Sequence, residues 1–126
     1  MSQAAASATG SLPPVISEYL AASDRGDDEA VIRCFTEDAV VVDEGRQWRG
    51  TAPIRRWRAT VATAYQYTVQ VTGAEALGEV DGLERHDVYI HLEGNFPGGK
   101  VDLTDRFALR DGRIASLEIV PAGPTR

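Results

Sequence analysis

Three side chains that could do acid–base chemistry fall at positions where the sequence pattern predicts a buried environment. Tyr19 lies on the apolar face of an expected helix, and Asp43 ends the β-branched run at residues 39–42. Asp105 interrupts an alternating apolar row that also contains Val101, Leu103, Phe107 and Leu109. A buried carboxyl group either finds a bonding partner or becomes protonated, because an unpaired buried charge is costly. These three residues are therefore the candidates for chemistry.

Two short helices are expected to bring Tyr19 toward the first strand. Two consecutive prolines suit the first turn of the first helix, and its inward face holds Val15, Ile16, Tyr19, Leu20 and Ser23. Gly26 is typical of a helix stop, and Asp27 is expected to cap the second helix. The buried side of this second helix is predicted to contain Val31, Cys34 and Phe35.

A strand and a third helix should follow. The polar turn at residues 36–38 is expected to lead into a strand at 39–42 that is covered on both faces. Residues 47–50 are interpreted as a short return strand, and Thr51 as the cap of a helix with Pro53 in its first turn. The inner face of that helix holds Ile54, Trp57, Arg58 and Val61, with the arginine burying only its aliphatic stem.

From residue 67 onward the apolar pattern changes to a period of two, which indicates antiparallel sheet. Asp111-Gly112 is a strong hairpin signal. Strands are expected around residues 67–72, 87–93, 101–109 and 113–120, with a turn at 95–99. The sequence therefore predicts an α+β, cone-shaped fold, with three helices packed in the hollow of a curved, mostly antiparallel sheet. We expect one domain at residues 12–121, between flexible tails at 1–11 and 122–126.

Composition excludes several classes of function. The chain has 126 residues and a formal net charge of -6, which argues against nucleic acid and membrane as partners. Its first residues lack the basic start and apolar stretch of a secretion signal, so we expect a cytoplasmic protein. The single cysteine, Cys34, allows no intrachain disulfide. His86 and His91 should point to opposite faces of one strand, so we expect no metal site and no cofactor.

Three segments resemble a known superfamily: EYLAASDRGDDEAVIRCFTEDAVVVD at residues 18–43, RGTAPIRRW at 49–57 and TDRFALRDGRIASLEI at 104–119. They are similar to the nuclear transport factor 2-like superfamily, in its SnoaL-like and ketosteroid-isomerase-like branch, over roughly residues 13–121. The resemblance implies a cone-shaped fold. This fold hosts isomerases, cyclases, dehydratases, epoxide hydrolases and non-catalytic members.

The resemblance also implies roles for the three candidate residues. By position, Asp43 matches the base that removes a proton from carbon next to a carbonyl in the steroid isomerases. Tyr19 and a protonated Asp105 match the two donors that hydrogen-bond the enolate oxygen. We expect Trp57, His86 and Phe107 to line an apolar pocket for a small hydrophobic carbonyl compound. An enzyme of this kind would be isomerase-like, or cyclase- or lyase-like, and would use carboxylates and no metal.

Each candidate residue also has a structural interpretation. Tyr19 could be a core tyrosine bonded to a backbone carbonyl. Asp43 could cap the strand end or pair with Arg46 or Arg49. Asp105 could be tied to a backbone amide or to an arginine.

Two other classes of function stay open beside the isomerase hypothesis. One is a non-catalytic ligand-binding or dimerisation module of the same fold. The other is a SnoaL-like cyclase, dehydratase or epoxide hydrolase with Asp105 as acid or base. In each case we expect a homodimer formed through the outer face of the sheet, where Thr68, Gln70 and Thr72 lie.

Overall fold

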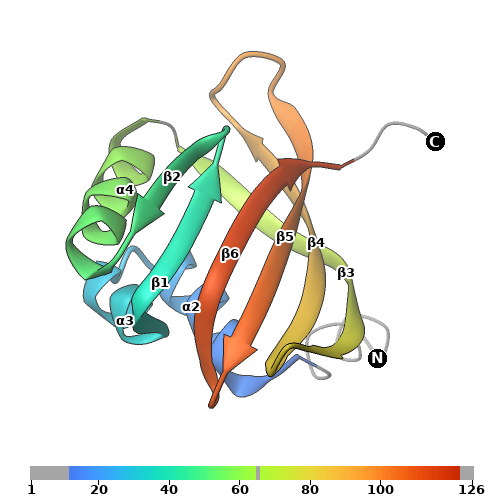
Figure 1. Ribbon diagram of the computed structural model, residues 1–126. Coiled ribbons are helices and arrows are strands. Elements are labelled where there is room, and N and C mark those ends of the chain that lie inside the picture. The colour runs from blue at the N-terminus through green and yellow to red at the C-terminus, as the bar shows by residue number, and fades with distance from the viewer. Residues whose placement is uncertain (1–11, 65, 123–126) are drawn as a thin grey trace.

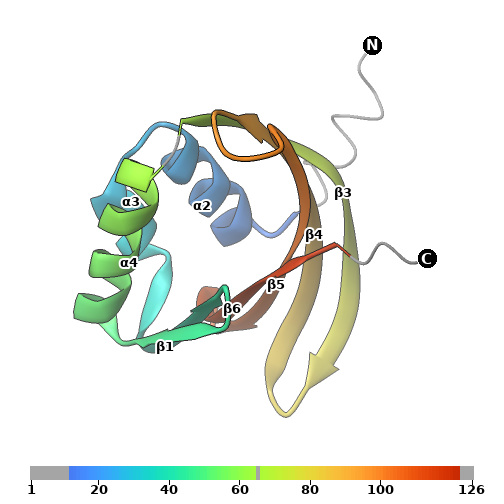
Figure 2. The same cartoon turned by 90° about the horizontal axis from the view of Figure 1, so that it is seen from above.

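The computed structural model describes residues 12–64 and 66–122 and contains helices on one face of a curved sheet (Figures 1 and 2). The described helices are α2 (Pro14–Asp24), α3 (Asp28–Arg33) and α4 (Thr51–Ala64). The strands are β1 (Phe35–Asp43), β2 (Arg46–Arg49), β3 (Tyr67–Val80), β4 (Leu83–Gly94), β5 (Lys100–Arg110) and β6 (Arg113–Pro121). The predicted α+β class is confirmed. Of the tails predicted at residues 1–11 and 122–126, residues 1–11 and 123–126 lie outside the described residues.

The connection between α2 and α3 has the expected chemistry. Gly26 has a φ of 72°, a left-handed conformation that glycine adopts without a steric penalty. The Asp27 side chain accepts a hydrogen bond from the backbone N–H of Ala30 at 3.1 Å and so caps α3. The turn between these helices therefore follows from local sequence.

None of the helices in the described part of the chain has the length and apolarity that a bilayer crossing requires.

Strand β1 differs from the prediction in two ways. It begins at Phe35, because Ile114 of β6 donates a backbone hydrogen bond to Cys34 at 2.8 Å, and residues 36–38 occupy an irregularity in the register rather than a turn. The strand is also fully buried on one face only. Ala39 and Val41 are inaccessible, whereas Val40 and Val42 are half-buried, because no described helix covers the outer face.

The sheet is mixed, with the strand order β2-β1-β6-β5-β4-β3 (Figure 1). Only β1 and β6 run parallel among its paired strands. The Asp111-Gly112 hairpin is confirmed, with φ values of 53° and 78°. Strands β3 and β4 are longer than the patterns predicted, since they continue to a second Asp-Gly hairpin at residues 81–82.

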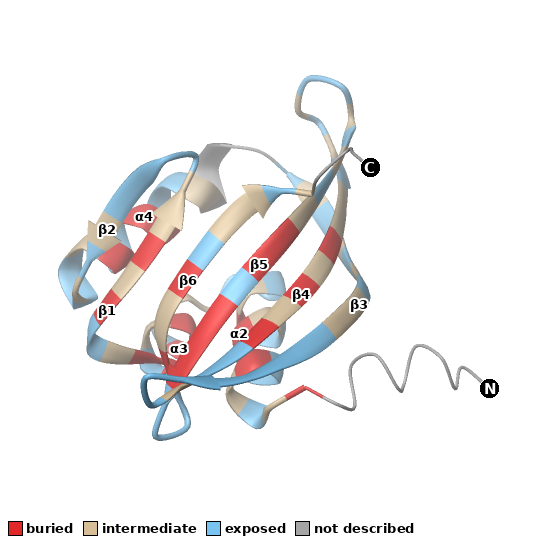
Figure 3. Ribbon diagram, turned by 45° about the vertical axis from the view of Figure 1, so that its right-hand side comes forward, coloured by how far each residue is buried: buried red, intermediate tan, exposed pale blue. Residues whose placement is uncertain are grey.

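The core lies between the helices and the inner face of the sheet. Burial alternates along the strands (Figure 3), and β1, β6 and β5 contribute Val41, Leu117 and Phe107 from one cross-strand row. The far end of β3 is more open, and Leu77 is 46% exposed there. The middle of the sheet therefore carries most of the hydrophobic stabilisation.

The burial of the row formed by Val41, Leu117 and Phe107 leads to a prediction about stability. Leu117→Ala should lower the free energy of unfolding by about 2–5 kcal/mol, because it leaves a cavity in a fully buried position. Leu77→Ala is the matched control on an exposed strand position and should change stability by less than about 1 kcal/mol. Urea unfolding followed by circular dichroism measures both values. Equal losses in the two variants would contradict this account of the core.

Candidate functional site

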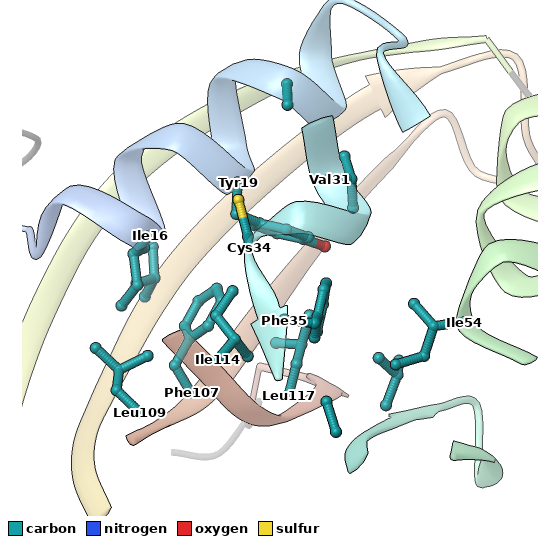
Figure 4. Packing of buried hydrophobic residues seen from close by; sticks show 14 of the residues in the cluster. Ile16, Tyr19, Val31, Cys34, Phe35, Ile54, Phe107, Leu109, Ile114 and Leu117 are labelled. Atoms are coloured by element: carbon teal, nitrogen blue, oxygen red, sulfur yellow. The ribbon is translucent and has the colours of Figure 1, made fainter. Parts of the chain in front are cut away.

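Tyr19 projects from α2 into the centre of the core (Figure 4). Its ring meets Phe35 and Phe107 edge to face, at centroid distances of 5.9 and 5.6 Å. Only 4% of the residue is exposed. Among the described residues its hydroxyl has no backbone partner, so the structure does not give it the purely structural hydrogen bond that the sequence allowed.

Asp43 ends β1 beside helix α4. Its Oδ2 atom accepts a hydrogen bond from the indole N–H of Trp57 at 3.0 Å. The sequence offered Arg46 and Arg49 as alternative partners for Asp43. Arg46 instead lies over the Trp48 ring, with Cζ 4.8 Å from the ring centroid. Within the described part of the chain, neither arginine forms an ion pair with Asp43. The structure thus places this carboxylate beside α4 rather than in the following loop.

Asp105 is buried on the inner face of β5, with 7% of the residue exposed. Its carboxyl group forms no hydrogen bond or ion pair with the described residues, so neither a backbone amide nor an arginine holds it. Burial, and then the nearby charge of Asp43, raise the pKa of Asp105 to about 7. This carboxyl group can therefore hold or release a proton near neutral pH.

The strand register places Asp43 and Asp105 in one row. Asp43 pairs with Ile119 on β6, and Ile119 pairs with Asp105 on β5. Residues directly opposite one another on neighbouring strands face the same side of a sheet. Neighbouring strands are roughly 4.8 Å apart, so the two aspartates have Cα positions on the order of 10 Å apart. Both carboxyl groups consequently face the helix side of the sheet.

The functional groups of Tyr19 and Asp105 are buried but not completely inaccessible. Among the described residues, no completely buried side-chain nitrogen or oxygen lacks a hydrogen-bond partner. The Tyr19 hydroxyl and the Asp105 carboxyl nevertheless have no partner in the described part of the chain. Both groups must therefore keep a small solvent-accessible area.

Arg58 and Tyr67 also belong to this region, and the sequence did not identify either of them as a functional residue. Burial and the charge of Asp105 raise the pKa of Tyr19, and Arg58 opposes that effect. The pKa of Tyr67 is also raised by burial, and the charges of Arg58, Asp43 and Asp105 act on it. Tyr67 begins the inward row of β3. The available signal was the apolar alternation that starts at this position, which indicates a strand but no functional role.

Arg58 is buried more completely than predicted. Only 4% of the whole residue is exposed, so the guanidinium group is buried together with the aliphatic stem. The reason is an ion pair between helices, in which Nε lies 3.3 Å from Oδ1 of Asp28 on α3. Its position on the apolar face of α4, directly after Trp57, was the available signal.

The expected pocket-lining residues do not share one hollow. Trp57 and Phe107 are buried near the aspartates. His86 instead bonds to Glu84 at 2.6 Å and borders a separate hollow of about 460 Å³ beside Leu12 and Leu109. Another hollow of about 770 Å³ lies between residues 36–38 and the β5–β6 hairpin. Tyr19, Asp43 and Asp105 line neither hollow.

Comparisons with known proteins agree with this fold. The model of the SnoaL-like domain family matches residues 16–117, and the chain belongs to this family. The comparison with curated proteins found no match. The chain is similar to the crystal structure of a candidate polyketide cyclase from Sinorhizobium meliloti, with 35% identity and a TM-score of 0.78 over 88% of this chain and 97% of that one.

Two other solved structures share the fold at lower identity. A protein with a ketosteroid isomerase-like fold from Catenulispora acidiphila, in complex with trimethylamine, is 18% identical, with a TM-score of 0.74 over 90% of this chain and 88% of that one. An epoxide hydrolase/cyclase-like enzyme of pyran ring formation in the polyether salinomycin is 24% identical, with a TM-score of 0.71 over 86% of this chain and 88% of that one. These two likenesses support the fold alone.

The raised pKa of Asp105 predicts how stability depends on pH. Between about pH 4 and pH 7 the folded protein holds a proton that the unfolded chain has lost, so this group lowers stability as the pH rises. Asp105→Asn should therefore gain stability relative to the wild type through this window, by on the order of 4 kcal/mol, and the difference should level off above it. Urea unfolding at several pH values measures the difference. A difference independent of pH would contradict the burial of an ionisable carboxyl.

A second prediction tests the coupling between the two aspartates. Asp43→Asn keeps an oxygen for the Trp57 indole but removes the charge, so it should lower the pKa of Asp105. The pKa should stay above its ordinary value of 3.8, because burial is the larger cause of the shift. Carbon-detected NMR titration of the carboxyl group measures this change. An unchanged titration midpoint would show that the two side chains do not act on one another.

Proposed function

We propose that this protein binds a small hydrophobic carbonyl compound and catalyses proton transfer at the carbon next to the carbonyl. The observation that carries the proposal is the buried Asp105 carboxyl, which has a pKa of about 7 and no described hydrogen-bond partner. It shares a cross-strand row with Asp43 and its charge acts on the Tyr19 phenol. A cone-shaped hollow between the helices and the sheet is part of this proposal.

Asp43 is the base in this mechanism. Trp57 occupies its Oδ2 atom, which leaves Oδ1 to take a proton from carbon. The electron pair of the broken C–H bond moves toward the carbonyl oxygen, where negative charge develops. In an isomerisation the carboxyl group of Asp43 then returns the proton to a different carbon of the same molecule.

Tyr19 and Asp105 are the donors to the developing oxyanion. The raised pKa of Tyr19 keeps its phenol protonated, and the raised pKa of Asp105 keeps a substantial fraction of its carboxyl neutral near pH 7. Both groups can then donate a hydrogen bond in surroundings from which water is largely excluded. Hydrogen bonds to a developing charge are stronger there than in water.

Intramolecular cyclisation is a second candidate function, favoured by the 35% identity to the candidate polyketide cyclase. Its first step is the same proton removal by Asp43. The resulting enolate carbon then attacks a second carbonyl of the same molecule, so that a carbon–carbon bond forms and the second oxygen takes up a proton. Epoxide opening or dehydration with Asp105 as acid or base, and ligand binding without turnover, are the remaining alternatives.

We also propose that the protein works as a cytoplasmic homodimer formed through the outer face of the sheet. Thr68, Gln70 and Thr72 are exposed on β3, which supports an accessible surface. The hydroxyl groups of Thr68 and Thr72 donate to carbonyl oxygens of β4, at 3.4 and 3.3 Å. This bonding leaves their methyl groups available for a contact between two copies.

Deuterium exchange tests the proton transfer. The wild type should accelerate exchange at the CH₂ group next to the ketone of methyl β-benzoylpropionate, measured by NMR in D₂O. Asp43→Asn should reduce the protein-dependent rate by about 10²–10⁴-fold, because it removes the base. Tyr19→Phe should reduce the rate by about 10²–10³-fold, because it removes one donor to the oxyanion.

Matched variants outside the site serve as controls. Asp38→Asn changes an exposed aspartate of β1, and Tyr89→Phe changes a tyrosine that bonds to Glu75 on the sheet surface. Both should keep the wild-type exchange rate. Unchanged exchange in Asp43→Asn would remove Asp43 as the base, and ligand binding without any exchange would favour the binding module.

A further inference from the structure

Arg58 is the one buried lysine or arginine among the described residues. It lies on the inner face of α4, directly after Trp57, and 4% of it is exposed. Removing a guanidinium group from water is costly unless its hydrogen bonds are satisfied. A residue in this position therefore requires a partner for its charge.

The described residues satisfy only part of the hydrogen-bonding capacity of the Arg58 guanidinium. The Nε atom of Arg58 contacts Asp28, whose side chain is 34% exposed, and Cζ lies 5.7 Å from the centroid of the Trp57 ring. The terminal guanidinium nitrogens form no hydrogen bond with the described residues. Because no completely buried side-chain nitrogen in this part of the chain lacks a partner, these nitrogens must keep a small accessible area.

This positive charge belongs to the same region as the candidate active site. Trp57, its neighbour on α4, donates to Asp43. Burial raises the pKa of both Tyr19 and Tyr67, and the charge of Arg58 opposes that rise. Within the described chain Arg58 forms an ion pair with Asp28 but with neither Asp43 nor Asp105, so its terminal nitrogens are available to an acid of a ligand.

We propose that the terminal nitrogens of Arg58 bind a carboxylate of the ligand, so that the site takes a keto carboxylate rather than a neutral ketone. The planar guanidinium fork matches the two oxygens of a carboxylate. Bound there, the ligand carboxylate anchors one end of the molecule, and its carbonyl lies toward Tyr19 and Asp105. The identity of the reacting carbonyl rests on the proposed function, whereas the carboxylate subsite does not.

A purely structural role for Arg58 would be to hold α4 against α3. A neighbouring pair already does this on the surface, where Arg55 donates two hydrogen bonds to Glu29 at 3.2 and 3.0 Å. Arg55 is 47% exposed at its side chain and belongs to the same helix. It is therefore the matched control, because its loss removes an α3–α4 ion pair without removing a buried charge.

The test compares β-benzoylpropionate with its methyl ester, which lacks the negative charge and carries one more methyl group at the same end. Isothermal titration calorimetry on the wild type should show the acid binding at least about tenfold more tightly than the ester. Arg58→Met should abolish this preference, and Arg58→Lys should weaken it because the fork is lost. Arg55→Met should retain the wild-type preference.

Equal affinity for acid and ester in the wild type would overturn the proposal, and this measurement needs no variant to fold. The proposal would also be overturned if Arg58→Lys and Arg58→Met both kept the wild-type preference for the acid.

Deuterium exchange in the same samples separates this inference from the proposed function. An Arg58-dependent preference without exchange supports the carboxylate subsite and removes only the proton transfer. Exchange with equal affinities removes the subsite and leaves the proton transfer in place.

Discussion

The burial of the Asp105 carboxyl, without a donor from the described residues, is the constraint on which the interpretation of this site depends. A carboxylate in such a place loses hydration that no protein group replaces, so its neutral form is favoured. Asp43 lies in the same cross-strand row, on the other side of Ile119, and its charge also raises the pKa of Asp105. A fold selected for stability alone would be better served by an apolar side chain at this position.

The surrounding architecture makes the two aspartates different. Asp43 stands at the end of a strand, partly exposed, and accepts a hydrogen bond from the Trp57 indole. Asp105 stands in the middle of a strand, between β4 and β6, without such a donor. The two carboxyl groups can therefore take different roles, because the burial of Asp105 favours its neutral form. The aromatic contacts of Tyr19 with Phe35 and Phe107 then hold a phenol in the same interior.

Local sequence predicted the parts of this arrangement that depend on neighbouring residues. Gly26 and Asp27 determine the turn between two helices, and the alternation around Asp105 correctly placed this carboxyl on a buried face. Contacts between distant segments could not be read in this way. The start of β1 at Phe35 depends on pairing with β6, and the partner of Asp43 depends on how α4 packs. The burial of the Arg58 guanidinium depends on Asp28 of another helix.

The parallel pairing of β1 with β6 connects these observations. Asp43 is separated from Asp105 by a long stretch of chain, and only the insertion of β6 between β1 and β5 aligns both with Ile119. A shift of one residue in that register would turn Asp43 to the outer face of the sheet and away from Trp57. The irregularity between Phe35 and Val40 sets the register of the strand that ends in Asp43. The position of the proposed base is thus a property of the sheet topology rather than of the segment that carries it.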